Sequence, residues 1–205
     1  MSNIFDRIES VHAATEGWCT WSKAQTLAAI VISTRPEISV EVGVWYGKSL
    51  LPVALAHQHI GKGRVIAIDP WMAENSIASQ VDPANIEWWK RQNIHQVAYD
   101  TFRSKVYELG LQNVVQIERK ASDAFQPPHG INLIHVDGNH GDQSVRDIER
   151  YAPEVARGGF LVADDLAWSG GSVTRAIGLL PAMGFTELYR VENDKESWAC
   201  FQRTK

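Results

Sequence analysis

Short runs of β-branched residues alternate along the chain with longer stretches in which apolar residues recur every three or four positions. This alternation is typical of strands followed by helices that pack on a mostly parallel sheet. Each predicted strand is followed by a helical or loop segment, and the predicted strands are residues 38–42, 64–69, 114–118, 131–137 and 159–164. The pattern therefore predicts an α/β fold in which helices cover a central sheet.

A covering helix is predicted at residues 143–156, because its apolar residues fall on one face and its charged residues on the others. The pair Gly158 and Gly159 is expected to end that helix. Residues 185–191 and 197–203 are strand-like and are joined by a polar turn, which predicts an antiparallel hairpin. We therefore expect a Rossmann-like, doubly wound and mostly parallel sheet of seven strands that closes with this C-terminal hairpin.

The chain is expected to form a single domain over residues 1–205, because 205 residues of which 44% are hydrophobic suffice for one substantial core. Residues 1–35 are expected to form an N-terminal helical cap. Residues 70–90 are rich in Trp, Met, Asn, Ser and Pro and are too long for an ordinary connection, so they are a candidate substrate lid. A long helical stretch is predicted over residues 86–109.

The formal net charge of -4 provides no basic stripe of the kind that binds phosphate backbones. We therefore expect a small-molecule partner rather than nucleic acid or a membrane surface, and a homo-oligomer is left open. The two cysteines, Cys19 and Cys200, form no CxxC pair, which argues against a disulfide framework and a zinc site. The first residues are charged, and no apolar run approaches the roughly 20 residues of a membrane span. A cytoplasmic location is expected.

Residues 40–50 read VEVGVWYGKSL and stand where the first strand gives way to a helix. Glycines at this point let the backbone approach a ligand at the N-terminus of the helix. The spacing of Gly43, Gly47 and the following Lys-Ser is one residue short of a P-loop. The dinucleotide fingerprint G-x-G-x-x-G is also absent, because its second glycine position holds Trp45.

The remaining pattern is E-x-G-x-x-x-G followed by an acidic residue at the end of the second strand, and it suits S-adenosylmethionine. Glu41 is expected to hold the ammonium of this cofactor, directly or through water, and Asp69 to accept hydrogen bonds from both ribose hydroxyls. The alternative is a tight strand-to-helix turn that binds no ligand. The position of Asp69 favours the cofactor, with Gly43, Trp45 and Gly47 in the loop that contacts it.

Acidic residues end the fourth and fifth predicted strands. Asp137 ends the fourth, and Asp164 and Asp165 end the fifth. Carboxylates at the same edge of adjacent parallel strands can converge on one ion, because neighbouring strands lie about 4.8 Å apart. Such an oxygen set favours Mg²⁺ first, with Ca²⁺ or Mn²⁺ next. Both Asp164 and Asp165 can be ligands only if the chain turns at Asp165. The alternative for any single aspartate is a helix cap or a surface salt bridge.

His140 follows Asp137 in a Gly-Asn turn, which would lift its side chain over the edge of the sheet. Beside a bound cation the protonated imidazole is disfavoured, so His140 would be neutral and ready to accept a proton. His135 lies on the strand between apolar neighbours and is expected to be a buried packing or hydrogen-bonding residue. His140 and Asp137 are therefore the candidate catalytic residues.

Five segments in this order resemble the class I S-adenosylmethionine-dependent methyltransferases, and within them the metal-dependent O-methyltransferases: EVGVWYGKS, Asp69, ASDAF, HVDGNH and GGFLVADD. The resemblance implies that Ser49 contacts the methionine carboxylate and that Ser122 lies near the adenine ring. It also implies that Asp137, which the cofactor also contacts, binds a metal ion together with Asp164 and Asp165.

His140 stands where catechol O-methyltransferases have a catalytic lysine and where sugar-modifying O-methyltransferases have a histidine proposed as the base. A catechol acceptor is not expected, because that lysine is absent and Asp165 replaces an asparagine of the catechol group. Trp71 and Trp168 are expected to line the acceptor pocket, while Trp88 and Trp89 are each as consistent with the core as with the pocket.

The hypothesis from the sequence is methyl transfer to a hydroxyl of a small molecule, assisted by a divalent ion. Two alternatives remain open at this point. One is a nucleotide or phosphate-handling enzyme with a degenerate P-loop, and the other is a catalytically inactive methyltransferase-like binding module.

Overall fold

The computed structural model describes residues 3–80 and 82–205 and contains a seven-stranded sheet with the strand order β3-β2-β1-β4-β5-β7-β6. The first five strands in this order run parallel, and β7 runs antiparallel to both β5 and β6. The strands are β1 (Ile38–Val42), β2 (Arg64–Ile68), β3 (Val115–Glu118), β4 (Ile131–Val136), β5 (Val155–Asp164), β6 (Phe185–Glu192) and β7 (Ser197–Arg203). The predicted mostly parallel sheet with a C-terminal antiparallel hairpin is confirmed.

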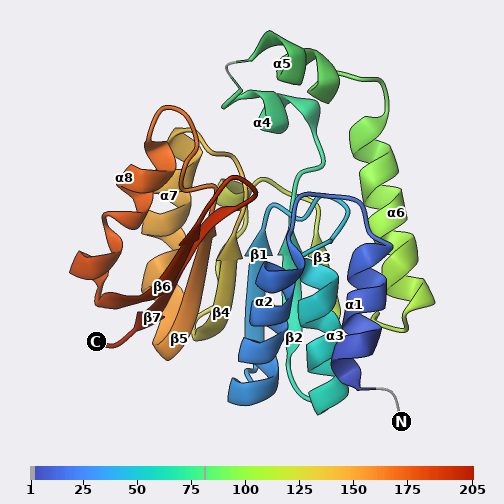
Figure 1. The fold of residues 1–205 in the computed structure, drawn as a ribbon, viewed down its shortest axis with the longest axis vertical. Coiled ribbons are helices and arrows are strands. Elements are labelled where there is room, and N and C mark those ends of the chain that lie inside the picture. The colour runs from blue at the N-terminus through green and yellow to red at the C-terminus, as the bar shows by residue number, and fades with distance from the viewer. Residues whose placement is uncertain (1–2, 81) are drawn as a thin grey trace.

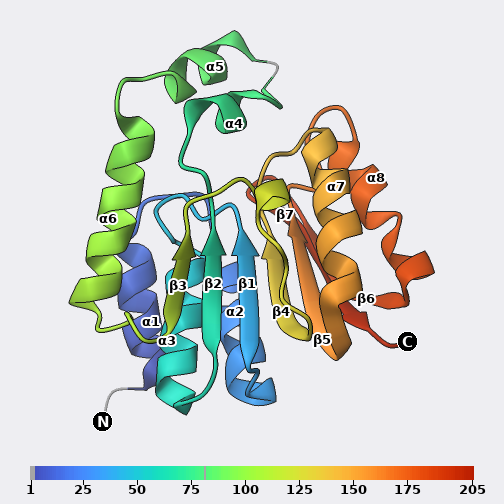
Figure 2. The ribbon, with the colours of Figure 1, turned by 180° about the vertical axis from the view of Figure 1, so that it is seen from behind.

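Helices cover both faces of the sheet (Figures 1 and 2). One face carries α1 (Ile4–Ala13), α2 (Trp21–Thr34), α3 (Leu50–Ile60) and α6 (Ile94–Glu108). The other face carries α7 (Asp142–Tyr151) and α8 (Ser172–Ile177). Three 3₁₀ turns complete these elements: η1 (Ser122–Ala124), η2 (Ala152–Glu154) and η3 (Leu180–Met183). None of the helices among the described residues is both long and apolar enough to cross a membrane.

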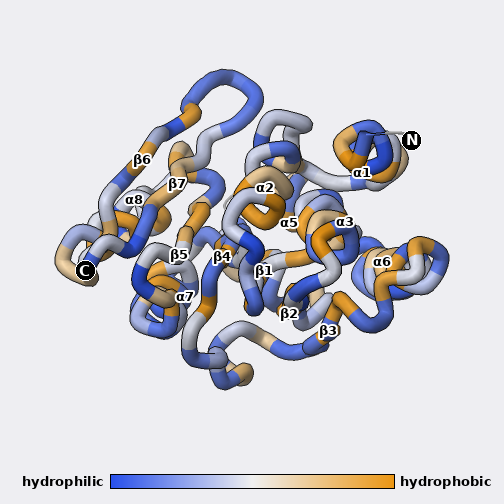
Figure 3. The backbone as a smooth tube through the Cα atoms, turned by 90° about the horizontal axis from the view of Figure 1, so that it is seen from below, coloured by the Kyte–Doolittle hydropathy of each residue, from blue (hydrophilic) through white to orange (hydrophobic). Residues whose placement is uncertain are grey.

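Each face of the sheet has its own hydrophobic core. Val40 and Val42 of β1 pack on the α7 side, whereas Leu133 of β4 and Val162 of β5 pack on the side of α2 and α3. Because strand residues alternate between faces, Glu41 faces α2 and α3 as well. The tube in Figure 3 shows hydrophobic stretches along β5 and α3 and a mainly hydrophilic loop between β6 and β7.

The predicted helix at residues 143–156 is too long at its C-terminal end. It ends at Tyr151, and η2 then leads directly into β5. Gly158 and Gly159 lie inside β5 and do not cap a helix, so this prediction is wrong. The pairing of β4 with β5 shifts register here, between Ile131 and Leu133. A Cβ on Gly159 would lie 3.0 Å from the carbonyl oxygen of Ile131. The two glycines therefore lie at an irregularity in the pairing of β4 with β5, where the strands approach too closely for a larger residue at Gly159.

The predicted long helix over residues 86–109 is interrupted. It divides into α5 (Pro83–Trp89) and α6, and Asn93 between them has a left-handed φ of 64°. The candidate lid at residues 70–90 contains α5 and the short helix α4 (Ala73–Ile77), with residue 81 outside the described residues. Both helices lie above the carboxyl ends of the central strands (Figure 1). Whether this segment moves as a lid stays a prediction.

Candidate active site

A cavity of about 950 Å³ opens at the carboxyl edge of the parallel strands. Its volume is at the upper end of the range found for small-molecule sites, and open α/β sheets bind ligands at this edge. Its walls come from the loop before α2, the turn after β1 that contains Gly43 and Gly47 (the glycine turn), the α4–α5 segment and the ends of β4 and β5. The predicted site residues that line it are Gly43, Trp45, Ser49, Asp69, Ser122, Asp137, His140, Asp164, Asp165 and Trp168.

Asp69 organises the turn between β1 and α3. Its Oδ2 atom accepts hydrogen bonds from the backbone N–H groups of Val44, at 2.9 Å, and Trp45, at 3.0 Å. Its Oδ1 atom accepts one from the N–H of Trp71, at 2.6 Å. Burial raises the pKa of Asp69, and the three backbone hydrogen bonds oppose that shift. A carboxylate has about four acceptor sites, so the present arrangement leaves about one for a ligand hydroxyl.

The two glycines of the turn are required by contacts within the protein. Gly43 has a φ of +85°, and a Cβ there would lie 2.0 Å from the carbonyl oxygen of Asp137. Gly47 has a φ of +84°, and a Cβ there would lie 2.5 Å from the ring of Phe102 in α6. Gly43 therefore allows the β1 turn to contact the β4 turn, whereas Gly47 allows the same loop to pack against a helix.

Glu41 and Gly47, both in the described part of the chain, lie outside the cavity wall. The Glu41 side chain is 1% exposed, and its Oε1 atom accepts a hydrogen bond of 2.7 Å from the hydroxyl of Ser49. Burial raises the pKa of Glu41 to about 8, although Ser49 opposes the shift. Direct contact of Glu41 with a cofactor is therefore not supported, and its link to the cavity runs through Ser49.

Ser122 lies in the cavity wall at the turn that follows β3. Its hydroxyl donates to Asp147 Oδ1 of α7 at 2.6 Å, and its carbonyl oxygen accepts a hydrogen bond of 2.8 Å from Tyr151. Burial raises the pKa of Asp147, while the hydrogen bonds from Ser122 and Gln143 lower it. The position of Ser122 is thus held by α7 at the edge of the cavity.

Asp137, His140 and Asp165 form one group of candidate ligand atoms, which lie within 4.8 Å of one another. His140 Nε2 is 2.9 Å from Asp165 Oδ2. The chain turns at Asp165, which has a φ of 54°. Burial alone would raise the pKa of Asp165, but the hydrogen bond and charge of His140 hold it below its usual value.

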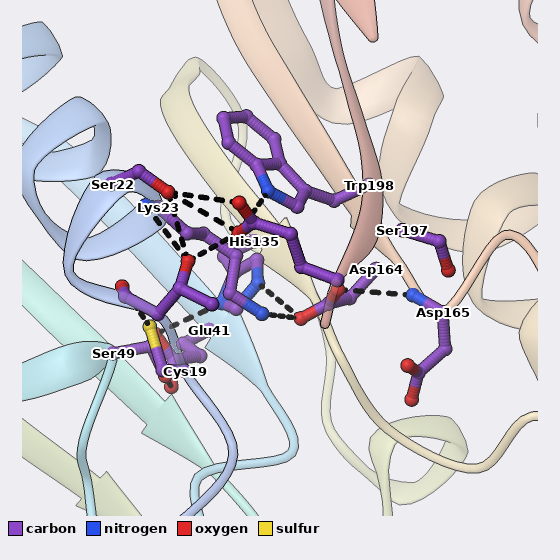
Figure 4. A network of polar contacts seen from close by, with 12 residues as sticks. Cys19, Ser22, Lys23, Glu41, Ser49, His135, Asp164, Asp165, Ser197 and Trp198 are labelled. Carbon is purple, nitrogen blue, oxygen red and sulfur yellow. Dashed lines mark hydrogen bonds and ion pairs between the residues drawn. The ribbon is translucent and has the colours of Figure 1, made fainter. Parts of the chain in front are cut away.

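The side chain of Asp164 points toward Lys23, whereas the side chain of Asp165 points away from it (Figure 4). It forms an ion pair with Lys23 of α2, and its Oδ2 atom is 3.6 Å from His135 Nε2. Its candidate metal group contains His135 and Asp137 but not Asp165. The three predicted metal ligands therefore do not converge as one set, because consecutive residues at the end of β5 point to different sides. His135 itself is buried, as predicted.

Lys23 is a cavity residue that the sequence argument missed. It is 3% exposed and lies in the first turn of α2, where a cation opposes the helix dipole. A lysine is rarely buried without a partner. A lysine at the start of an apolar helix was therefore the available signal, but the sequence alone does not identify its partner.

The tryptophans divide between core and cavity. Trp71 is 2% exposed, stacks on Phe102 and donates from Nε1 to the carbonyl oxygen of Trp45 at 2.9 Å. The prediction that Trp71 lines the acceptor pocket is therefore wrong. Trp168 does line the cavity, and its ring centroid is 4.4 Å from that of His140.

Three further aromatic contacts, all made by Trp18, lie in the wall of the cavity. Trp18, which the sequence argument missed, contacts Trp45 of the glycine turn and both tryptophans of α5. The helix α4 contacts a different wall of the cavity, because Asn139 Nδ2 donates to the carbonyl oxygen of Asn75 in α4 at 2.8 Å. The α4–α5 segment thus contacts both the glycine turn and the turn that carries His140.

The strand order, with five parallel strands and an antiparallel β7, is that of the class I methyltransferase fold, and both the glycine turn and the acidic strand ends line its cavity. The sequence matches the family described as "Methyltransferase domain" over residues 40–166. The chain belongs to this methyltransferase family, and the resemblance inferred from its motifs is confirmed. The degenerate P-loop alternative is thereby rejected. No curated protein matches the sequence.

Solved O-methyltransferases have similar folds. The structure of NovP has a TM-score of 0.68 at 16% identity, with 90% of this chain and 79% of that chain covered. The O-methyltransferase from Bacillus cereus in complex with SAH has a TM-score of 0.64 at 14% identity, covering 98% and 91% of the two chains. TomG from Streptomyces achromogenes, which is involved in tomaymycin synthesis and was solved with SAM, has 0.66 at 13%, covering 100% and 91%. At these identities the similarity concerns the fold.

Proposed function

We propose that this protein transfers the methyl group of S-adenosylmethionine to a hydroxyl group of a small molecule, with the assistance of a divalent ion. The observation that supports this proposal most directly is a single cavity whose wall contains both the glycine turn and the Asp137, His140 and Asp165 group. In this arrangement the methyl donor would bind beside a hydroxyl that can lose its proton.

The cofactor would occupy the side of the cavity formed by β1, β2 and the turn after β3. The remaining acceptor site of Asp69 suits a ribose hydroxyl, and Ser122 is in the wall where the adenine ring is expected. Ser49 lies in the wall near the expected methionine end. Binding both substrates in one cavity gives the acceptor oxygen a fixed position relative to the methyl carbon.

Asp137 and Asp165 are suited to hold the divalent ion, because both present carboxylate oxygens within the same group of candidate ligand atoms. Mg²⁺ is commonly bound by one or two carboxylates together with water. A bound divalent ion lowers the pKa of a hydroxyl that it coordinates. Asp137 is buried, which raises its pKa, so a neighbouring cation also favours its ionised form.

His140 is the residue positioned to take the hydroxyl proton. Its Nε2 atom is within hydrogen-bond distance of Asp165 Oδ2, so we assign the N–H to Nε2 and the acceptor role to Nδ1. Trp168 packs against the imidazole and restricts its orientation. His140 would then accept the proton as the acceptor oxygen forms its bond to the methyl carbon and the sulfonium becomes a thioether.

The test uses methyl transfer from labelled S-adenosylmethionine to a panel of small hydroxylated molecules in the presence of Mg²⁺. We expect His140→Ala to lower turnover about 10²- to 10⁴-fold, the usual effect of losing a general base, while calorimetry shows unchanged affinity for S-adenosylhomocysteine. His129→Ala is the matched control, because the His129 side chain is 91% exposed. Wild-type turnover in His140→Ala would contradict the assignment of the base. Absence of S-adenosylhomocysteine binding to the wild type would contradict the proposed function as a whole.

A further inference from the structure

The ammonium group of Lys23 contacts the carboxylate that the resemblance assigns to the metal ion. We propose that Lys23 is a positioning residue that keeps Asp164 out of the ion site, so that Asp137 and Asp165 hold the divalent ion and Asp164 does not. This inference rests on the proposed function, because it concerns the ion of that same site.

Lys23 extends from the first turn of α2 to the end of β5 (Figure 4). Both side chains of the pair are almost fully buried, with 3% of Lys23 and 5% of Asp164 exposed. The start of α2 is also tied to the neighbouring hairpin, because Thr20 and Ser22 donate hydrogen bonds to Glu196. The ammonium is therefore held in place by the fold and is not a mobile surface charge.

The Asp164 carboxylate is occupied on both oxygens. Oδ1 accepts a hydrogen bond of 3.0 Å from the N–H of Asp165, and Oδ2 contacts the Lys23 ammonium and lies 3.6 Å from His135 Nε2. By contrast, 41% of the Asp165 side chain is exposed. An ion reached from the cavity therefore finds Asp165 accessible and Asp164 already paired with a cation.

The charges of these side chains also favour an ion held by Asp137 and Asp165 and an Asp164 that is paired with Lys23. Three aspartates carry three negative charges, and one is neutralised by Lys23, so the two that remain match one divalent ion. A divalent ion at Asp164 would instead lie beside the ammonium, and the two cations would repel each other.

The experiment measures Mn²⁺ binding by electron paramagnetic resonance, with S-adenosylhomocysteine binding measured in parallel by calorimetry. Asp165→Asn is expected to weaken Mn²⁺ binding by at least about 10-fold. Removing only Asp164 would leave a buried, unpaired lysine and risks unfolding, so the informative variant is the double substitution Lys23→Met/Asp164→Asn. This variant is expected to bind Mn²⁺ within about threefold of the wild type, since both ion-holding carboxylates remain.

Lys23→Met alone leaves Asp164 without its cation, so its folding is checked first by circular dichroism. In the folded variant Asp164 is free as a third carboxylate and no ammonium repels the ion, so Mn²⁺ binding is expected to tighten about 10-fold or more. Lys62→Met is the matched control, because Lys62 forms an exposed ion pair with Glu37, and it should change nothing. Loss of Mn²⁺ binding in the double variant, with retention in Asp165→Asn, would overturn the inference while the proposed function stands. If the wild type binds S-adenosylhomocysteine but no Mn²⁺, the inference and the ion-assisted step both fail. If it binds neither, methyl transfer itself is excluded.

Discussion

Gly43→Ala is the substitution whose effect the structure specifies most sharply. The residue has a φ of +85°, and an added Cβ would lie 2.0 Å from the carbonyl oxygen and 2.5 Å from the carbonyl carbon of Asp137. The left-handed backbone costs about 1 to 2 kcal/mol for alanine. Displacing the facing backbone adds about 1 to 3 kcal/mol, as overpacking does elsewhere. We therefore expect the free energy of unfolding to fall by about 2 to 5 kcal/mol.

Urea denaturation followed by circular dichroism measures this loss, and Gly61→Ala provides the matched control. Gly61 also has a positive φ, of +63°, but apart from its neighbours in the chain no described atom lies within 4 Å of its added Cβ. It should lose only the backbone contribution of about 1 to 2 kcal/mol. Because the clash would displace Asp137, Gly43→Ala should also weaken S-adenosylhomocysteine binding, whereas Gly61→Ala should not. Equal stability losses and unchanged binding in both variants would refute the reasoning.

Two further predictions concern buried groups near the site. Trp71→Ala should lower the free energy of unfolding by about 3 to 5 kcal/mol, because it removes a core side chain, whereas Trp168→Ala should mainly raise KM for the acceptor; the reverse pattern would contradict the division between core and cavity. For Glu41, burial raises the pKa from 4.5 to about 8, so the folded protein binds a proton that the unfolded chain releases. Its contribution to stability is complete below about pH 4.5 and is lost as the pH rises toward about 8. Urea denaturation at several pH values should therefore show a flatter profile for Glu41→Gln, and identical profiles would contradict the raised pKa.

The sequence alone was sufficient for the order of strands and helices and for the edge of the sheet at which the site lies. Strand and helix periodicity is a local property of the chain, so β1, β2, β4 and the C-terminal hairpin could be predicted closely. The site could be predicted because Gly43, Asp69, Asp137 and Asp165 all follow strands, and the carboxyl ends of parallel strands share one edge. The glycine pair in β5 was misread because a helix end and a β-bulge both use glycine.

The tertiary structure decided the direction and partner of each side chain. Asp164 and Asp165 are adjacent in sequence, yet the turn at Asp165 separates them and only Asp165 joins His140. The partner of Asp164 is Lys23, which is 141 positions away in the chain. Local patterns carry no information about such a contact, since it depends on how α2 packs against the sheet. The sequence thus determined which residues meet at the carboxyl edge, and only the packing of α2 on β5 determined which of the three carboxylates is already neutralised.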